Sequence, residues 1–296
     1  MKKQFLALAL AAVGLLFGAA QSTQAEQLIA LTTTNQLVTF DSATPGTTTT
    51  LVVTGVSGTL VGIDRRPANG LLYGISSNGG IYTINTTTGA ATLVSTSSAT
   101  PSGASFGVDF NPVPDRLRVT SNTDQNLRID VTTGTAITDG MLAFAGADPN
   151  TGVNPNIVGS AYTNNFAGTT TTTLYGLDSN LNILVTQNPP NDGTLNTVGG
   201  LGVNFGDNVG FDVSGSGIAY AVLQPMGVAF SSLYTINLTT GAATLIGQVG
   251  TGAGFVLNGL AAPVGAPIPE PTTMLLLGTG LAGVAARVRR RRKANS

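Results

Sequence analysis

A thirteen-residue segment that occurs twice constrains the fold of this chain more than any other feature. It reads Tyr82-Thr-Ile-Asn-Thr-Thr-Thr-Gly-Ala-Ala-Thr-Leu-Val94 and returns, with two differences, at residues 234–246. Looser copies occupy residues 37–47, 127–137 and 183–195. Alternating β-branched residues on both sides of a glycine predict strand, turn and strand, because glycine adopts the positive φ of such turns without steric cost. The chain is therefore expected to consist of hairpins.

Each hairpin belongs to a longer unit whose first strand carries a glycine. These unit glycines are Gly62, Gly107, Gly159, Gly210 and Gly259, at separations of 45, 52, 51 and 49 residues. A period near fifty with four short strands per unit is typical of a β-propeller blade. Residues 28–53 supply three strands and residues 256–262 supply one, so joining them closes a ring without exposed edges. We predict an all-β propeller of five blades, each of four antiparallel strands, closed by pairing of the C-terminal strand with the N-terminal blade. An open two-sheet sandwich is the alternative.

Both ends of the chain have the composition of targeting segments. Residues 1–25 combine Lys2 and Lys3, an apolar run and small residues before Ala25, which predicts a secretory signal peptide cleaved after Ala25 by signal peptidase. The propeller domain would then occupy residues 26–265 and a tail residues 266–296. In the tail an apolar stretch, residues 272–286, precedes an arginine-rich end. This stretch is short for the ~30 Å hydrocarbon core, so we expect a thin or tilted stop-transfer segment with the arginines on the cytoplasmic side. It would insert transiently into the inner membrane; an ordinary single-pass anchor is the alternative.

The tail closely resembles the PEP-CTERM sorting signal, which consists of Pro-Glu-Pro, a short hydrophobic stretch and an arginine-rich end. The matching residues are Pro269, Glu270 and Pro271, followed by the basic residues 289–292. The resemblance implies that an exosortase recognises and processes the tail at the envelope of a Gram-negative bacterium that makes exopolysaccharide. By the same resemblance, the processed protein would lie at the cell surface or outside the cell.

The body resembles the secreted bacterial family known as domain of unknown function 4394 from about residue 28 to residue 263. The resemblance rests on Val61-Gly-Ile-Asp-Arg-Arg-Pro67, Phe106-Gly-Val-Asp-Phe-Asn-Pro112, Asp115-Arg-Leu-Arg-Val-Thr-Ser121 and residues 161–165 and 186–197. No activity is assigned to that family, so the resemblance implies none.

Composition excludes several functions. The segment 26–268 has five basic residues against thirteen acidic ones, a net charge of −8, and no lysine, which argues against binding to nucleic acid. Without histidine or cysteine there is no Ser-His-Asp triad and no thiolate or histidine metal site. We therefore predict no catalytic residues, no cofactor and no metal. Residues 122–126 with Asp130 resemble a calcium loop only faintly, because the glycine and the distal glutamate are missing.

Two groups of charged residues are candidate binding sites. Asp64, Asp109 and Asp212 occupy one position in three units, near the expected axis, where they would face a shared channel mouth; alternatively, each accepts N–H bonds from the turn after its strand. The second group is a local basic cluster formed by Arg116, Arg118 and Arg128. It would bind the carboxylates of an acidic polysaccharide, or pair with Asp115, Asp124 or Asp130.

These observations favour an exported, non-enzymatic propeller that binds a ligand such as exopolysaccharide or forms part of an extracellular matrix. An aspartate-based enzyme acting on exopolysaccharide is one alternative, since glycoside cleavage needs only two carboxylates. A purely structural biofilm component is the other.

Overall fold

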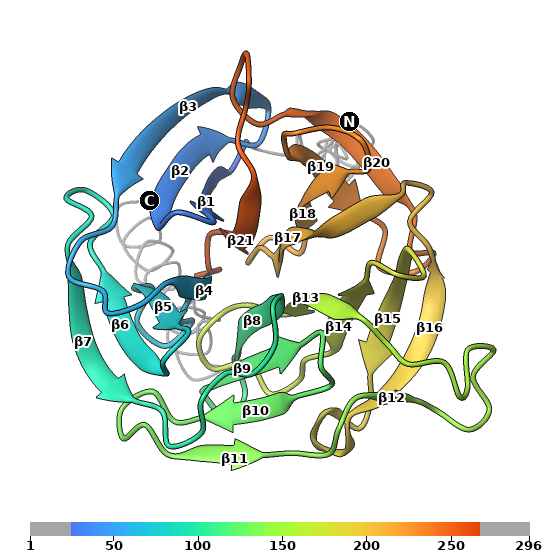
Figure 1. The fold of residues 1–296 in the computed structure, drawn as a ribbon. Helices are drawn as coiled ribbons and strands as arrows, with labels where there is room; N and C mark the ends of the chain where they lie inside the picture. The colour runs from blue at the N-terminus through green and yellow to red at the C-terminus, as the bar shows by residue number, and fades with distance from the viewer. Residues whose placement is uncertain (1–24, 267–296) are drawn as a thin grey trace, which may run out of the picture.

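The computed structural model describes residues 25–266, where short runs of β-branched and aliphatic residues form five separate antiparallel sheets around one axis (Figure 1). Each sheet is a propeller blade built on four antiparallel strands, to which one blade adds a fifth, so the predicted five-bladed propeller is confirmed. No helix among these residues is long and apolar enough to cross a membrane. Residues 1–24 of the predicted signal peptide and residues 267–296 of the sorting tail lie outside the described residues.

Blade 1 joins the two ends of the described chain. From the axis outward its strands are β21 (Leu257–Ala261), β1 (Gln27–Thr32), β2 (Gln36–Asp41) and β3 (Thr44–Val52). β21 pairs antiparallel with β1, with Ile29 opposite Ala261 and Leu31 opposite Gly259. The ring is therefore closed as predicted, by the C-terminal strand of the body.

The other blades follow in chain order, each with its first strand at the axis. Blade 2 consists of β4 (Leu60–Arg65), β5 (Leu72–Ser76), β6 (Gly80–Ile84) and β7 (Ala91–Thr96). Blade 3 consists of β8 (Phe106–Asn111), β9 (Arg116–Ser121), β10 (Asn126–Ile129) and β11 (Ala136–Thr138). Blade 4 consists of β13 (Ile157–Tyr162), β14 (Leu174–Asp178), β15 (Ile183–Gln187) and β16 (Thr194–Gly200), and blade 5 of β17 (Phe205–Val213), β18 (Ala219–Pro225), β19 (Ser232–Ile236) and β20 (Ala243–Gln248).

Blade 4 has two additions that periodicity did not reveal. The insertion before it contributes β12 (Ala143–Phe144), which pairs parallel with β16 as a fifth strand. A short 3₁₀ turn, η1 (Pro190–Asp192), separates β15 from β16. β12 is the outermost strand of the blade, and η1 contacts blade 3, because Asn191 accepts a bond from Arg118.

The two close copies of the repeated segment are the outer hairpins β6–β7 and β19–β20, and their turns have one chemistry. The Oδ1 atom of Asn85 accepts bonds from the backbone N–H groups of Thr87 and Thr88, and Asn237 does the same for the two residues that follow Leu238. The glycine of each turn has a positive φ, 75° at Gly89 and 83° at Gly241. The repeat thus encodes a side-chain-capped turn.

Aliphatic side chains pack between neighbouring blades at four of the five blade contacts. Buried clusters join blades 1 and 2, blades 2 and 3, blades 4 and 5, and blades 5 and 1. The contact between blades 3 and 4 is instead centred on a buried polar network around Arg118. Blade 3 is therefore held to blade 4 by directional bonds at a position where the other contacts are apolar.

Candidate functional site

Because the unit glycines have no side chain, the five inner strands approach one another closely. The space along the axis is narrow at the level of these glycines, and we call this narrow part the waist. A Cβ atom on Gly107 would lie 2.5 Å from the backbone nitrogen of Ser160, and one on Gly210 would lie 2.6 Å from that of Leu260. All five unit glycines line the axial space at this level, whose volume of about 10 Å³ is room for about one water molecule. The repeated glycine is thus required by the close approach of the blades.

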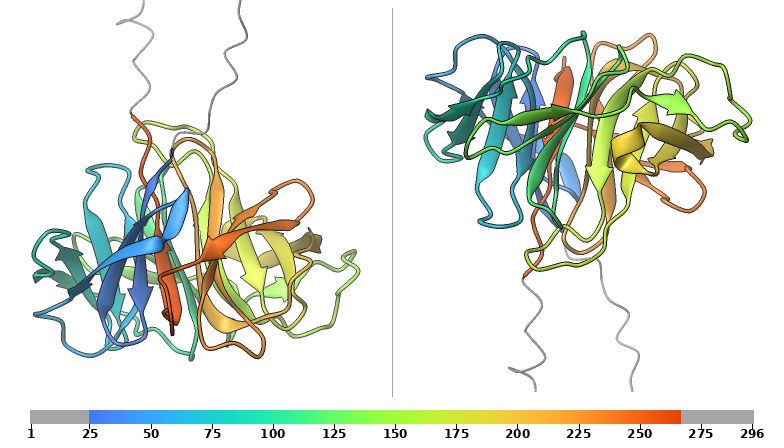
Figure 2. Two further views of the ribbon diagram at one scale, coloured as in Figure 1. Left: turned by 90° about the horizontal axis from the view of Figure 1, so that it is seen from above. Right: turned by 90° about the horizontal axis from the view of Figure 1, so that it is seen from below.

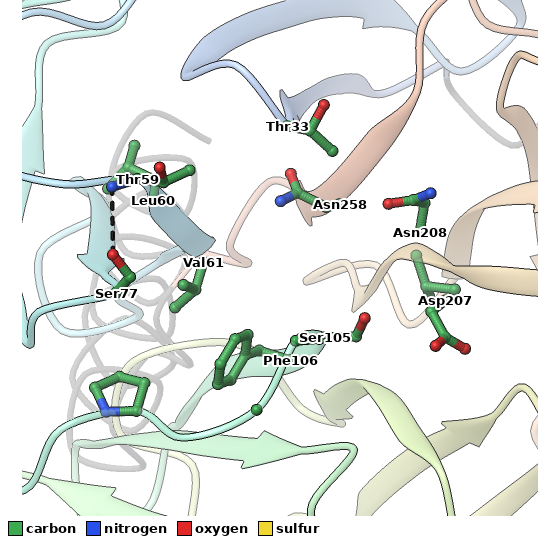
Figure 3. Close-up of a pocket in the computed structure, with 14 residues that line it drawn as sticks. Thr33, Thr59, Leu60, Val61, Ser77, Ser105, Phe106, Asp207, Asn208 and Asn258 are labelled. Atoms are coloured by element: carbon green, nitrogen blue, oxygen red, sulfur yellow. Dashed lines mark hydrogen bonds between the residues drawn. The ribbon is translucent and has the colours of Figure 1, made fainter.

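A pocket of about 400 Å³ opens at the end of the axis where the inner strands begin (Figure 3). Its polar groups are the hydroxyls of threonine and serine residues, two asparagine amides and one carboxylate, and Phe106 supplies an aromatic wall. The polar residues are Thr33, Thr59, Ser77, Ser105, Asp207, Asn208 and Asn258. Ser105, Asn208 and Asn258 stand one or two positions before a unit glycine. This placement is the sequence signal that could have identified the pocket.

The opposite end of the axis lies beside the last described residues. Because β1 and β21 are antiparallel, β1 starts where β21 ends, and both ends lie on the face opposite the pocket (Figure 2). The segment after β21 is held there: Gly215 N–H donates to the Pro263 carbonyl over 2.7 Å, and Gly265 N–H to Asn165 over 2.8 Å. The pocket therefore faces away from the point where residue 266 leaves the propeller.

Three aspartates converge on the axis on the side of the waist that lies away from the pocket: Asp64, Asp109 and Asp212. Their side chains are buried, with 1%, 1% and 0% of their surface exposed. One carboxylate oxygen from each lies within 4.8 Å of the others. The repeat thus located all three at the axis, but they do not face an open channel mouth, because the waist and the segment after β21 enclose them.

Each of these carboxylates accepts a backbone N–H from the next blade around the ring. Asp64 accepts from Phe110 over 2.7 Å, Asp109 from Tyr162 over 3.2 Å and Asp212 from Ala262 over 2.6 Å. The expected turn donor is present at Asp64, which also accepts from Arg65 N–H over 2.6 Å. The aspartates thus join blade to blade rather than only closing their own turns.

Burial without a cationic partner raises the pKa of all three carboxyl groups. Burial is the main cause at Asp64, and the charge of Asp212 adds to it, so its pKa lies well above the usual value. The pKa of Asp109 is raised in the same way, by burial and then by Asp64 and Asp212. Burial raises the pKa of Asp212 to about 7 against the opposing effect of its backbone donors. Such a cluster favours either bound protons or a bound cation.

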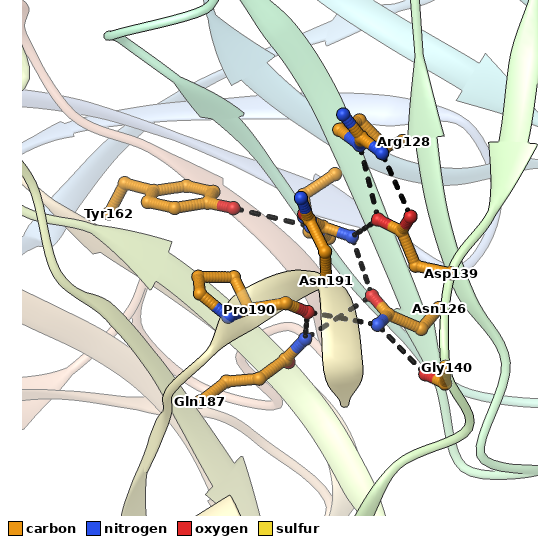
Figure 4. A network of polar contacts seen from close by, with 9 residues as sticks. Asn126, Arg128, Asp139, Gly140, Tyr162, Gln187, Pro190 and Asn191 are labelled. Atoms are coloured by element: carbon orange, nitrogen blue, oxygen red, sulfur yellow. Dashed lines mark hydrogen bonds and ion pairs between the residues drawn. The ribbon is translucent and has the colours of Figure 1, made fainter. Parts of the chain in front are cut away.

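Each of the three arginines of blade 3 forms an ion pair with an aspartate of this chain. Arg118 is 1% exposed, and its guanidinium donates to Asp139 and Asn126 over 2.7 Å and to Asn191 over 2.8 Å (Figure 4). Arg128 pairs with the other oxygen of Asp139 over 3.0 Å. Asp139 was not among the partners considered from the sequence, because its position depends on how the insertion folds back.

Arg116 pairs with Asp130 over 3.3 Å, as one alternative anticipated. It lies at the surface, whereas Arg118 on the same strand faces blade 4. Most of the faint calcium loop is also engaged: Asn122 accepts N–H bonds from Ala104 and Ser105, and Asp130 caps the turn that follows it, whereas Asp124 Oδ1 is buried without a partner. Neither group of residues presents free ligand atoms toward solvent at one place.

Comparison with known proteins establishes the family. Residues 16–261 match the family described as domain of unknown function DUF4394, and the chain belongs to it. Residues 267–291 match the PEP-CTERM protein-sorting motif, which implies export, processing by an exosortase and sorting to the cell surface. Ala25, the expected cleavage position, is the first described residue, and Pro269, Glu270 and Pro271 lie outside the described residues. No curated protein sequence is significantly similar to the chain.

Solved structures are similar to the chain only at low sequence identity and low TM-score. One is a protein of unknown function from Bacteroides thetaiotaomicron, 18% identical over 82% of this chain and 64% of the other, with a TM-score of 0.44. An auxiliary nutrient binding protein from the same organism is 16% identical over 65% and 55% of the two chains, with a TM-score of 0.39. Hydrazine synthase of Kuenenia stuttgartiensis is 17% identical over 66% and 51%, with a TM-score of 0.38. The chain spans roughly half to two-thirds of their length.

Proposed function

We propose that this protein is a non-catalytic, cell-surface binding protein whose ligand, a neutral glycan, occupies the pocket at the open end of the propeller axis. The observation that carries the proposal is the placement of this pocket of about 400 Å³ on the face opposite residue 266, where the sorting tail begins. A body attached through its tail would present the pocket outward.

The lining favours uncharged sugars. Hydroxyl and amide groups exchange hydrogen bonds with sugar hydroxyls, and an aromatic ring such as Phe106 packs against the apolar face of a sugar. Among the lining residues none is basic, and Asp207 is the only carboxylate. The arginines considered for acidic polysaccharides are engaged by Asp139 and Asp130. An uncharged exopolysaccharide therefore suits the pocket better than an acidic one.

The enclosure of the aspartates supports a non-catalytic role. Glycoside hydrolysis requires two carboxyl groups ~5–9.5 Å apart, on either side of the scissile bond. Asp64, Asp109 and Asp212 are buried on the side of the waist away from the pocket, and the waist admits about one water molecule. A glycan in the pocket would not contact them.

A glycan array probed with the exported protein tests the proposal. Ser77 lies exposed at the rim of the pocket, so a Ser77→Trp variant fills the mouth; Ser216, exposed on the opposite face, gives the matched control Ser216→Trp. We expect the wild type and Ser216→Trp to retain the same neutral glycans, and Ser77→Trp to bind them at least about tenfold more weakly. Absence of glycan binding by the wild type would favour a purely structural matrix role.

The enzymatic alternative is distinguished in the same experiment. Glycans retained by the wild type are incubated with the protein, and new reducing ends are measured over time. We expect none, because no accessible pair of carboxylates faces the pocket. Turnover that disappears in Ser77→Trp would establish that the pocket is an active site.

A further inference from the structure

The aspartate cluster connects all five blades at one point. The carboxylates come from blades 2, 3 and 5, and they accept N–H groups from blades 3, 4 and 1. The equivalent positions in blades 4 and 1 are Ala161 and Ala261, which leave room on the axis. The three carboxylates therefore link blades 2, 3 and 4 in a row and blade 5 to blade 1.

Not every oxygen of the cluster is used in these bonds. Asp109 Oδ2 and Asp212 Oδ1 are buried and accept no hydrogen bond among the described residues. Removing a carboxylate oxygen from water without a partner costs several kcal/mol. These two oxygens have no partner, and they belong to a cluster whose ligand atoms lie within 4.8 Å of one another. Their position is therefore where a proton or a cation would bind.

No arginine forms an ion pair with the cluster among the described residues. The ion pairs there involve Asp115, Asp130 and Asp139 and leave the three axial carboxylates aside. The charge of Arg65 acts on Asp64 and Asp212, but its guanidinium donates to the carbonyl of Gly70 over 3.1 Å. One guanidinium does not balance three carboxylates, so further countercharge has to come from protons or from a metal ion.

We propose that Asp64, Asp109 and Asp212 bind one calcium ion on the propeller axis, and that this ion stabilises the ring of blades. Calcium takes oxygen ligands at ~2.3–2.6 Å, so two oxygens bound to it lie up to about 5 Å apart, and the three carboxylate oxygens, all within 4.8 Å of one another, meet this limit. Magnesium demands near-octahedral geometry and retains several waters, for which this enclosed site has little room. Three carboxylates, mono- or bidentate, supply between three and six oxygens.

The ion would exchange slowly, because the waist on one side and residues 263–265 on the other separate the cluster from solvent. Calcium bound during folding should therefore persist through purification. Removal should require unfolding in a chelator, followed by refolding without the metal.

The test measures metal content and thermal unfolding of the exported protein. We expect about one calcium per chain by elemental analysis, and a melting temperature that falls by about 5–15 °C after refolding in EDTA and recovers in ~1 mM CaCl₂ but not in MgCl₂. Asp212→Asn keeps an acceptor for the Ala262 N–H but removes a ligand charge, so it should lose both the metal and the response. Asp192→Asn, an exposed carboxylate in η1, is the matched control and should behave as the wild type.

The opposite result is equally specific. If the aspartates share protons instead, the wild type contains no calcium, its melting temperature is the same in EDTA and in calcium, and Asp212→Asn raises that temperature at neutral pH by removing a buried charge. That outcome overturns the proposal. Should Asp212→Asn fail to fold, metal content and the EDTA response of the wild type decide between the two.

Discussion

At the scale of single residues, Arg118 shows what a local pattern reveals and what it leaves out. Alternation along the strand places Arg116 and Arg118 on one face, and this suggested a shared anion site. In the structure Arg116 is 39% exposed, while Arg118 is buried against blade 4 and Asp139. The partner comes from an insertion twenty-one residues further along, and the repeat contains no information on where that insertion packs.

The two arginines make a matched pair for mutation. Arg118→Ala leaves Asp139 buried with only Arg128 as its partner, so we expect a loss of about 3–5 kcal/mol in the free energy of unfolding. Arg116→Ala removes a surface ion pair and should cost no more than about 1 kcal/mol. Urea unfolding of both variants measures the difference. Equal losses would show that the polar network does not hold blades 3 and 4 together.

The aspartates at the axis are the opposite case. Their shared position in three units was enough to predict that Asp64, Asp109 and Asp212 come together, since equivalent positions of a closed ring meet near the axis. Their burial was not predictable, because it depends on how closely the glycine-bearing strands approach and on where residues 263–265 cross. The binding of a calcium ion by these residues is a prediction, which the metal analysis and the unfolding experiment test.

At the scale of elements, the unit glycines fixed the number and order of the blades, and the structure explains why a glycine stands there. The third N-terminal strand shows a limit of local signals. Pro45-Gly46 is a pair that usually interrupts a strand, yet β3 runs through both residues from Thr44. Proline is tolerated because β3 is the outermost strand of its blade and has a free edge. The two-residue β12 is too short to give any periodic signal.

Two glycine substitutions test the packing of the inner strands. In Gly210→Ala the new Cβ would meet the backbone of Gly259 and Leu260 in blade 1, and backbone cannot move aside cheaply, so we expect a loss of at least about 2 kcal/mol. Gly200→Ala, at the end of β16, meets nothing within 4 Å and should change stability by less than about 0.5 kcal/mol. Thermal unfolding compares the two variants. An unaffected Gly210→Ala would mean that the blades lie further apart than described.

At the scale of the whole molecule, the propeller is a ring with two different ends. One end carries the pocket, and the other carries the segment that leads to residue 266 and the sorting motif. Ring closure and sorting were predictable because strand counts and short motifs are written in the chain. The pocket was not predicted, because its lining residues come from four blades and only some of them, such as Asn208 and Asn258, stand one or two positions before a unit glycine.

The orientation of the body at the cell surface tests the central claim most directly. The chain contains no cysteine, so single cysteines at Ser77 and Ser216 give unique labels on the pocket face and the opposite face. Purified Ser77→Cys and Ser216→Cys should react with a membrane-impermeant maleimide at similar rates. On intact cells we predict that Ser77→Cys is labelled and that Ser216→Cys reacts more slowly, because its face is turned toward the envelope. Equal rates on intact cells would contradict an outward-facing pocket, and labelling only after lysis would contradict sorting to the surface.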